Sequence, residues 1–186
     1  MRMRRNMRSL FVLQSLVILL LVSTLQLFPI CSIMVRASGK IIKTGDKAPT
    51  VSMESLDGQV YKLGGERSRP LLLNFWASWC EPCKLEAPEL QRLTQKYGEK
   101  LDIYGVNVTS DDSIQEVQKF VDNYRLTFPI LLDKQGSLFA KFSGVAFPTN
   151  IVIGKDGRVK HINIGLLPME RLESQIQGEI DRTQPK

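Results

Sequence analysis

Cys80 and Cys83 are separated by two residues and lie between an apolar run, Leu71–Trp76, and a segment of helical periodicity. A continuous apolar run of this length is typical of a buried central strand. We expect a helix over Pro82–Tyr97, because proline is tolerated in the first turn and Gly98 stands where a C-terminal cap belongs. The sequence therefore places the cysteine pair where a buried strand meets the start of a helix.

This placement predicts redox chemistry. Two cysteines three positions apart in a first helical turn can meet the separation between Cα atoms of roughly 4.4–6.8 Å that a disulfide requires. The unpaired N–H groups and the dipole of a helix N-terminus stabilise a thiolate there. We assign Cys80 as the attacking nucleophile and Cys83 as the resolving thiol of a redox-active disulfide. The sequence predicts no metal and no other cofactor.

A zinc site and a purely structural disulfide are two other possible uses of the pair. A zinc site would need two more ligands, and the candidates are Cys31, in the apolar N-terminal segment, and His161, the single histidine. A purely structural disulfide would close a loop too short to constrain the unfolded chain much. Both are weaker interpretations of the cysteines than redox chemistry.

The N-terminal segment predicts a membrane anchor. Residues 1–37 contain five arginines and no acid, and no charged residue stands between Arg8 and Arg36. This stretch is long enough to span about 30 Å of hydrocarbon as a helix. We therefore expect residues 9–35 to lie in the lipid bilayer of the cell membrane as a single pass. The arginines before the span stay in the cytoplasm, which puts the rest of the chain on the extracytoplasmic side.

Cleavage or lipidation of this segment would change the anchoring. A cleavable signal peptide has a similar layout, but its apolar region usually spans about 7–15 residues. Val35 and Ala37 are small residues that would suit a cleavage site, so a signal sequence stays an alternative to the anchor. Lipidation at Cys31 is disfavoured, since Ile30 occupies a position where a small residue is expected.

The remainder of the chain is nearly neutral and long enough for one domain. The whole chain has 25 basic and 19 acidic residues, so removing the five arginines leaves 20 against 19. The basic pI is therefore no evidence for nucleic-acid binding. Residues 38–48 are polar and contain glycine, as expected of a linker, and residues 49–180 are expected to form the domain.

Periodicity along this domain alternates between strand and helix. A helix capped by Asp111, Asp112 or Ser113 is expected to bury Ile114, Val117, Val121 and Tyr124, and a last amphipathic helix carries Met169, Leu172 and Ile176. Besides 71–76, the expected strands are Gln59–Leu63, Leu101–Val108, Phe128–Leu132, Thr149–Ile153 and Val159–Ile164. Alternating strands and helices indicate an α/β fold.

The active-site string resembles a known family. FWASWCEPCK, with Pro88, resembles the thioredoxin active site, and Phe147-Pro148-Thr149 resembles the cis-proline loop that faces it in that fold. The Glu-Pro dipeptide, the apolar N-terminal segment and an extra strand–helix insertion around residues 109–132 resemble the extracytoplasmic TlpA/ResA branch. Over residues 45–178 the resemblance implies a thioredoxin-like fold, with a mixed central sheet flanked by helices. It also implies a substrate-binding surface at Trp79, Phe147, Pro148 and Thr149.

Glu86 is the least expected residue on the predicted helix. Helical spacing puts it on the stripe of Cys83 and Leu90, which should face the sheet. One interpretation is an acid that favours the helix dipole and reaches solvent. The other, implied by the matching family position, is a catalytic acid near the sulfurs with a perturbed pKa. Asn74 stands where thioredoxins carry a buried aspartate, which makes Glu86 the candidate proton acceptor.

The direction of the reaction and the partners follow from charge and resemblance. Glu81, between the cysteines, opposes a thiolate by like charge, and this favours a disulfide reductase over a disulfide-forming oxidant. The resemblance implies disulfide-containing protein substrates, among them apocytochrome c in cytochrome c maturation, and a membrane thiol donor of the CcdA type. A general or sporulation-related thiol reductase is the main alternative.

The sequence lacks the cysteine patterns that two further functions would require. Thiol peroxidases of related architecture place a lone cysteine after a loop that carries a threonine, a pattern absent at Cys80. Copper-delivery modules of this fold need a longer cysteine spacing and a nearby histidine, whereas His161 is far away in sequence. A Cys80→Ser substitution separates the redox functions from pure binding, which could survive the loss of the thiol.

Overall fold

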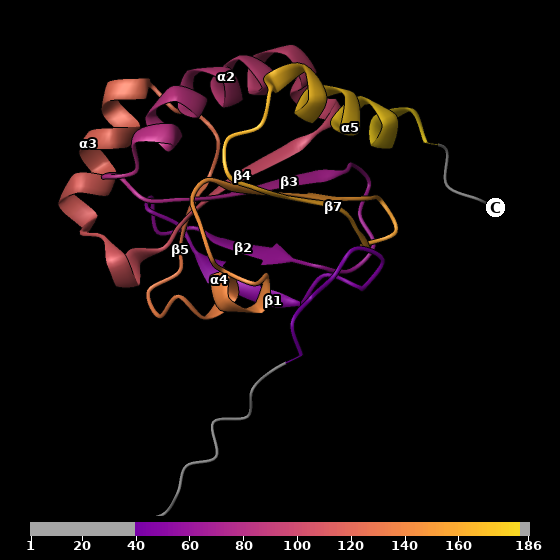
Figure 1. The fold of residues 1–186 in the computed structure, drawn as a ribbon, viewed down its shortest axis with the longest axis horizontal. Coiled ribbons are helices and arrows are strands. Elements are labelled where there is room, and N and C mark those ends of the chain that lie inside the picture. The colour runs from indigo at the N-terminus through magenta and orange to yellow at the C-terminus, as the bar shows by residue number, and fades with distance from the viewer. Residues whose placement is uncertain (1–39, 183–186) are drawn as a thin grey trace, which may run out of the picture. The chain divides into compact units, whose positions relative to one another are not determined.

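The structure, a computed structural model, describes residues 40–182, and a five-stranded mixed sheet forms its centre (Figure 1). The strand order is β5-β4-β3-β6-β7, with β3 parallel to β4 and antiparallel to β6. The strands are β3 (Leu71–Trp76), β4 (Asp102–Asn107), β5 (Ile130–Leu132), β6 (Thr149–Ile153) and β7 (Val159–Ile164). This arrangement confirms the predicted mixed sheet, and it makes the apolar run that precedes the cysteines the central strand.

Helices cover both faces of this sheet. The helices are α2 (Glu81–Tyr97), α3 (Ile114–Tyr124), α4 (Ser137–Lys141) and α5 (Met169–Asp181), with short 3₁₀ turns η1 (Gly98–Lys100) and η2 (Thr109–Asp111). In Figure 1, α2 and α5 lie along one face of the sheet and α4 lies by the other. Helix α2 ends as predicted, because Gly98 has a positive φ of 44° and caps the helix.

Strand β3 divides the core into two apolar clusters, because alternate residues of a strand point to opposite faces. Leu72 and Trp76 join the cluster that includes Leu90 and Leu93 of α2. Leu71, Leu73 and Phe75 join the cluster on the other face. Asn74 lies two residues from both Leu72 and Trp76, so its side chain points to the same face of the sheet as theirs. This places a polar side chain on the face that α2 covers.

Strand β1 (Val51–Glu54) and helix α4 were not predicted. Strand β1 pairs with β2 (Val60–Leu63) in a separate two-stranded antiparallel sheet, so the strand predicted at 59–63 lies outside the central sheet. Strand β1 and helix α4 were missed because both are short, and neither has an apolar stripe long enough to be recognised. These elements cover the face of the sheet opposite α2 (Figure 1).

The buried face of α3 also differs from the prediction. Ser113 caps the helix, since its hydroxyl accepts a hydrogen bond from the N–H of Glu116 at 3.3 Å. From that start, Val117 and Phe120 are the residues that become buried, whereas Ile114 is 41% exposed. The prediction was wrong for Ile114, and Val121 and Tyr124 are only partly buried against the core, because the face that packs inward is centred on Val117 and Phe120.

Part of the predicted linker packs on the domain. Ile42 donates its N–H to the carbonyl of Lys141 at 2.8 Å, and Ala48 donates to that of Gly157 at 2.9 Å. Both side chains are buried. The predicted anchor at residues 9–35 lies outside the described residues. Within residues 40–182, no helix is long and apolar enough to cross a membrane.

Candidate active site

Cys80 and Cys83 form a disulfide at the start of α2, with Cα atoms 5.3 Å apart, inside the predicted range. Cys80 is the N-cap residue, and its sulfur accepts a hydrogen bond from the N–H of Cys83 at 3.2 Å. Both cysteines are buried, so only a small part of the pair meets solvent. The sequence thus placed the pair correctly, at a helix N-terminus where N–H groups face the sulfur of Cys80.

Glu86 lies one turn further along α2 and is buried beneath the surface, with 1% of its area exposed. One carboxylate oxygen, Oε2, accepts from Nδ2 of Asn74 at 2.8 Å, and Oε1 accepts from Nδ2 of Asn150 at 2.7 Å. Nδ2 of Asn74 also donates to Oδ1 of Asn150 at 2.9 Å. The acid is therefore enclosed between the helix and the two central strands β3 and β6, and the solvent-facing interpretation of Glu86 is wrong.

Burial makes Glu86 an unusually weak acid. Removal from water penalises the charged form and raises its pKa from 4.5 to about 7, although the bonds from Asn150 and Asn74 favour the carboxylate. A group with this pKa exchanges protons readily at neutral pH. The pKa of Glu86 is thus shifted upward, and desolvation is the main cause of the shift.

A small internal cavity connects the acid's environment with the resolving cysteine. Its volume is about 10 Å³, and Asn74 and Cys83 are both among its lining residues. This volume is at the lower limit for one water molecule. Asn74 therefore contacts the carboxylate of Glu86 and lines the same cavity as Cys83.

The predicted cis-proline loop is present beside the cysteines. The peptide bond between Phe147 and Pro148 is cis. Trp79 and Phe147 meet edge to face with ring centroids 5.7 Å apart, and both line a surface groove of about 420 Å³ that also contains Cys80. Trp79 is 59% exposed, so its ring offers apolar surface to a partner. The structure therefore brings Trp79, Phe147 and Cys80 together in one groove.

Pro148 and Thr149 differ in place from Phe147. Both are buried, and the hydroxyl of Thr149 donates to the carbonyl of Ala146 at 2.7 Å. The carbonyl of Pro148 accepts the N–H of Gly165 at 2.7 Å. Thr149 thus holds the loop in shape from within, while the groove itself is lined by Phe147, Ala146 and Val145.

Sequence reasoning missed Asn150, the second amide that holds Glu86. It occupies a strand, β6, in which every residue is buried. A polar amide inside a short buried strand needs a hydrogen-bond partner, and this was the available signal. The register completes the pairing, since Asn150 lies directly opposite Asn74 on β3.

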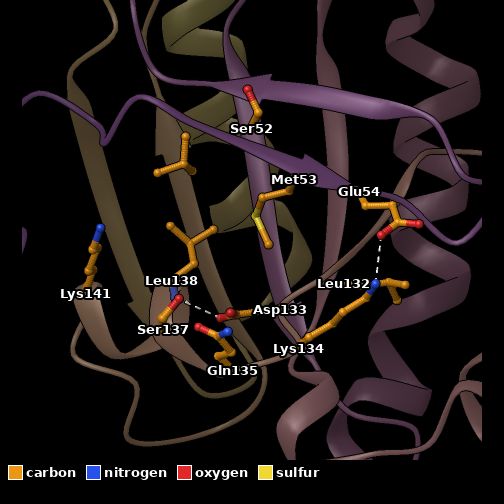
Figure 2. Close-up of a pocket in the computed structure, with 11 residues that line it drawn as sticks. Ser52, Met53, Glu54, Leu132, Asp133, Lys134, Gln135, Ser137, Leu138 and Lys141 are labelled. Carbon is orange, nitrogen blue, oxygen red and sulfur yellow. Dashed lines mark hydrogen bonds and ion pairs between the residues drawn. The ribbon is translucent and has the colours of Figure 1, made fainter.

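A second pocket lies away from the cysteines, between β1 and the segment from Leu132 to Lys141 (Figure 2). Its volume is about 350 Å³. Three of the four charged side chains that line the pocket, those of Glu54, Asp133 and Lys134, have partners within the protein. Asp133 accepts the N–H groups of Leu138 and Phe139, at 3.0 and 2.8 Å, and Lys134 pairs with Glu54 at 2.7 Å. The pocket contains none of the predicted site residues.

Comparison with known proteins agrees with this geometry. Residues 43–178 match the family model described as Redoxin. The chain belongs to the Redoxin family. This Redoxin-family chain is 34% identical over 175 residues to the thiol-disulfide oxidoreductase ResA of Oceanobacillus iheyensis, covering 91% of this chain and 89% of the relative. It is 36% identical over 136 residues to the thioredoxin-like protein YneN of Bacillus subtilis, covering 73% and 79%.

A solved structure gives the same result for the fold. The crystal structure of StoA from Bacillus subtilis matches with a TM-score of 0.61 at 27% identity, covering 69% of this chain and 96% of that one. The thioredoxin-like fold predicted from the active-site string is therefore confirmed. The Redoxin-family chain is a thiol-disulfide oxidoreductase of the ResA and StoA type.

Proposed function

We propose that this oxidoreductase works as a disulfide reductase, anchored in the cell membrane by residues 9–35 and acting on the extracytoplasmic side. The observation that carries the direction is the set of carboxylates around the disulfide. Glu86 is buried beneath the pair, Glu81 lies between the cysteines, and Asp111 lines the same groove as Cys80. Lys84, a nearby cation, is paired with Glu81 at 3.0 Å. Lys84 offsets the exposed charge of Glu81, so the buried Glu86 is the carboxylate that opposes the effect of the helix N-terminus and disfavours a thiolate at Cys80. A less stable thiolate makes the dithiol a stronger reductant.

The proposed reaction begins with the reduced enzyme. The thiolate of Cys80 attacks one sulfur of a substrate disulfide, a new S–S bond forms, and the other substrate sulfur leaves as a thiolate that takes up a proton. Cys83 then loses its proton and attacks the sulfur of Cys80. The second substrate thiol is released and the enzyme disulfide re-forms. Two electrons pass to the substrate, and a membrane dithiol must supply two more before the next cycle.

Glu86 is the proposed proton acceptor for Cys83. Its pKa of about 7 lies below that of an ordinary thiol, roughly 8.5, but close enough for proton exchange at neutral pH. Asn74 contacts Glu86 and shares the small cavity with Cys83. These contacts support a transfer of the proton of Cys83 to Glu86 through the region of Asn74.

The groove beside Cys80 is the proposed substrate-binding surface. Trp79 and Phe147 offer exposed aromatic surface next to the sulfur. An extended protein segment that lies across Pro148 would present its disulfide to Cys80. The proposed substrates are disulfide-containing proteins, with apocytochrome c as the specific candidate and a CcdA-type thiol carrier as electron donor. The resemblance to the TlpA/ResA branch supports these partners.

The anchor has one support from the comparisons. The match with the Oceanobacillus relative covers 91% of this chain, a share that cannot be reached without part of residues 1–39. The relative thus has a counterpart to the N-terminal segment. Cell fractionation, with protease added to intact spheroplasts, tests the location. We expect the domain to be in the membrane fraction and accessible to protease from outside, and a cytoplasmic domain would contradict the proposal.

The reduction potential tests the direction of the reaction. We would equilibrate the full-length protein in detergent with glutathione or dithiothreitol and follow tryptophan fluorescence. A value of about −250 mV or lower, comparable with thioredoxin, is expected for a reductase. A value near about −120 mV, comparable with DsbA, would make the protein a disulfide-forming oxidant.

A deletion strain tests the substrate. If apocytochrome c is reduced by this protein, the strain loses covalent haem on c-type cytochromes, and added dithiothreitol restores it. Unchanged cytochromes would reject this substrate, and a spore-formation defect in the same strain would instead favour the sporulation-related alternative. Cys80→Ser in the restored gene is the matched control for redox chemistry.

A further inference from the structure

The loop that precedes the cysteines is tied to the turn before α3. The backbone N–H of Val108 donates to the carbonyl of Trp76 at 3.1 Å. The indole Nε1 of Trp79 donates to the carbonyl of Asp111 at 2.8 Å. Between these two contacts lies Ser78, which is two residues before Cys80. Its position decides how the chain enters the first turn of α2.

Asp112 holds Ser78 by two hydrogen bonds. Its Oδ2 accepts the backbone N–H of Ser78 at 2.6 Å, and its Oδ1 accepts the hydroxyl of Ser78 at 2.6 Å. The same carboxylate also accepts from the backbone N–H of Ser113 at 2.8 Å and from Nδ2 of Asn107 at 2.9 Å. Hydrogen bonds to an ionised acceptor are stronger than those between neutral groups. All four donors therefore converge on one carboxylate.

The carboxyl of Asp112 is ionised at neutral pH. Partial burial raises its pKa, but the hydrogen bonds from Ser78, Asn107 and Ser113 outweigh burial and hold the pKa below its usual value. Asp112 was one of three candidate caps for α3. Ser113 caps that helix, so the carboxylate of Asp112 is free to turn back toward the active-site loop.

Asn107 supports this arrangement at a cost. Its side chain is fully buried, and among the described residues its Oδ1 has no hydrogen-bond partner. An unpaired buried acceptor is unfavourable, and a smaller apolar residue would avoid it. Turning the amide over would bring its oxygen against the carboxylate of Asp112. The hydrogen bond that Nδ2 of Asn107 donates to Asp112 explains why an asparagine stands at this position and why its amide nitrogen faces the carboxylate.

We propose that Asp112 is a positioning residue for thiol–disulfide exchange. By fixing Ser78, it fixes the chain that carries Trp79 and Cys80, and so determines how the sulfur of Cys80 meets a substrate disulfide. Small displacements of a reacting group strongly lower a rate that depends on orientation. The role rests on exchange at Cys80 and Cys83, and not on the direction in which electrons flow.

A double-mutant cycle tests this role. The full-length protein in detergent, as wild type, Asp112→Ala, Ser78→Ala and the double variant, is reduced and mixed with a disulfide-linked fluorescent peptide. The second-order rate constant of exchange is measured for each. Asp122→Asn is the matched control, because it removes an exposed acid from α3 that bonds only Gln118 among the described side chains. Circular dichroism and the unfolding midpoint establish that each variant is folded at the assay temperature.

We expect Asp112→Ala to lower the rate constant about tenfold and Ser78→Ala about threefold, because the serine variant keeps the bond from its backbone N–H. The double variant should be no slower than Asp112→Ala alone, because both changes remove the same contact. Asp122→Asn should stay within about twofold of the wild type.

Other outcomes separate the two proposals. Folded Asp112→Ala with a rate constant within twofold of the wild type would overturn the positioning role, as would effects of Ser78→Ala and Asp112→Ala that multiply independently. Because Ser78→Ala removes one surface-loop hydroxyl and is expected to fold, it keeps the test decisive if Asp112→Ala does not fold. In that case an unchanged rate for Ser78→Ala overturns the role, and a reduced one supports it. A wild type without exchange would contradict the exchange activity itself.

Discussion

Replacing Glu86 by glutamine should remove a strong pH dependence of folding stability. The buried carboxyl has a pKa of about 7, against an ordinary value of 4.5. Below pH 4.5 the group is protonated in both the folded and the unfolded chain, so it contributes nothing. Between pH 4.5 and 7 the unfolded chain has already lost the proton that the folded chain retains. The free energy of unfolding therefore falls as the pH rises through this window.

The size of this effect follows from the two pKa values. One proton bound only in the folded state changes the free energy of unfolding by about 1.36 kcal/mol per pH unit. Across the window from 4.5 to about 7, the wild type should lose about 3 kcal/mol through Glu86. Glu86→Gln cannot lose this proton. All other ionisable groups are shared by the two proteins, so the difference between their pH profiles isolates Glu86.

Urea unfolding of the oxidised wild type and of Glu86→Gln at pH 5 and pH 8 measures the effect. A constant offset between the two proteins at all pH values carries no weight, because glutamine also changes the hydrogen bonds to Asn74 and Asn150. The decisive quantity is the change of that offset with pH. If the offset between the two proteins changes by less than about 1 kcal/mol between pH 5 and pH 8, the pKa of Glu86 is not raised as described. The proposed proton transfer from Cys83 to Glu86 would then be rejected as well.

Four further substitutions test the site and the core. Cys80→Ser should abolish exchange, whereas Cys83→Ser should trap a mixed disulfide at Cys80 that is visible on a non-reducing gel; a stable adduct through Cys83 instead would reverse the two roles. Trp79→Ala should raise the KM for a disulfide peptide several-fold with little change in urea midpoint, because the ring is 59% exposed; an unchanged KM would remove Trp79 from the binding surface. Phe75→Ala should cost about 3–5 kcal/mol in urea unfolding, because the ring is fully buried against Phe139 and Phe142, and a loss below about 1 kcal/mol would contradict that packing.

Local signals in the sequence were sufficient for the elements that carry the cysteines. A run that is apolar except at Asn74 predicted β3 with the correct ends. Pro82 and Gly98, at the two ends of α2, predicted that helix to within a residue. The cysteine pair could be placed because its environment is set by neighbours in the chain. The strands Thr149–Ile153 and Val159–Ile164 were likewise correct, since a Gly-containing turn separates two short segments rich in valine and isoleucine.

Contacts distant in the chain could not be predicted from such signals. The environment of Glu86 depends on Asn150, which is 64 positions away and reaches it only through the pairing of β3 with β6. The contact between Asp112 and Ser78 spans 34 positions and depends on how β4 lies beside β3. Periodicity shows that a residue faces the interior, but it does not show which residue meets it there.

The hydrogen bonds around Glu86 suit only one of its protonation states. Both carboxylate oxygens face N–H donors, from Asn74 and from Asn150, which is the arrangement for an ionised acid. A protonated Glu86 keeps acceptor capacity on both oxygens but gains one O–H, and this donor is bonded only if it meets an oxygen rather than the N–H groups of these amides. An asparagine side chain that turned its oxygen toward Glu86 would provide that acceptor. Because Asn74 also lines the cavity at Cys83, such a rotation would change the polar lining of that cavity and so link the protonation of Glu86 to the surroundings of the resolving cysteine.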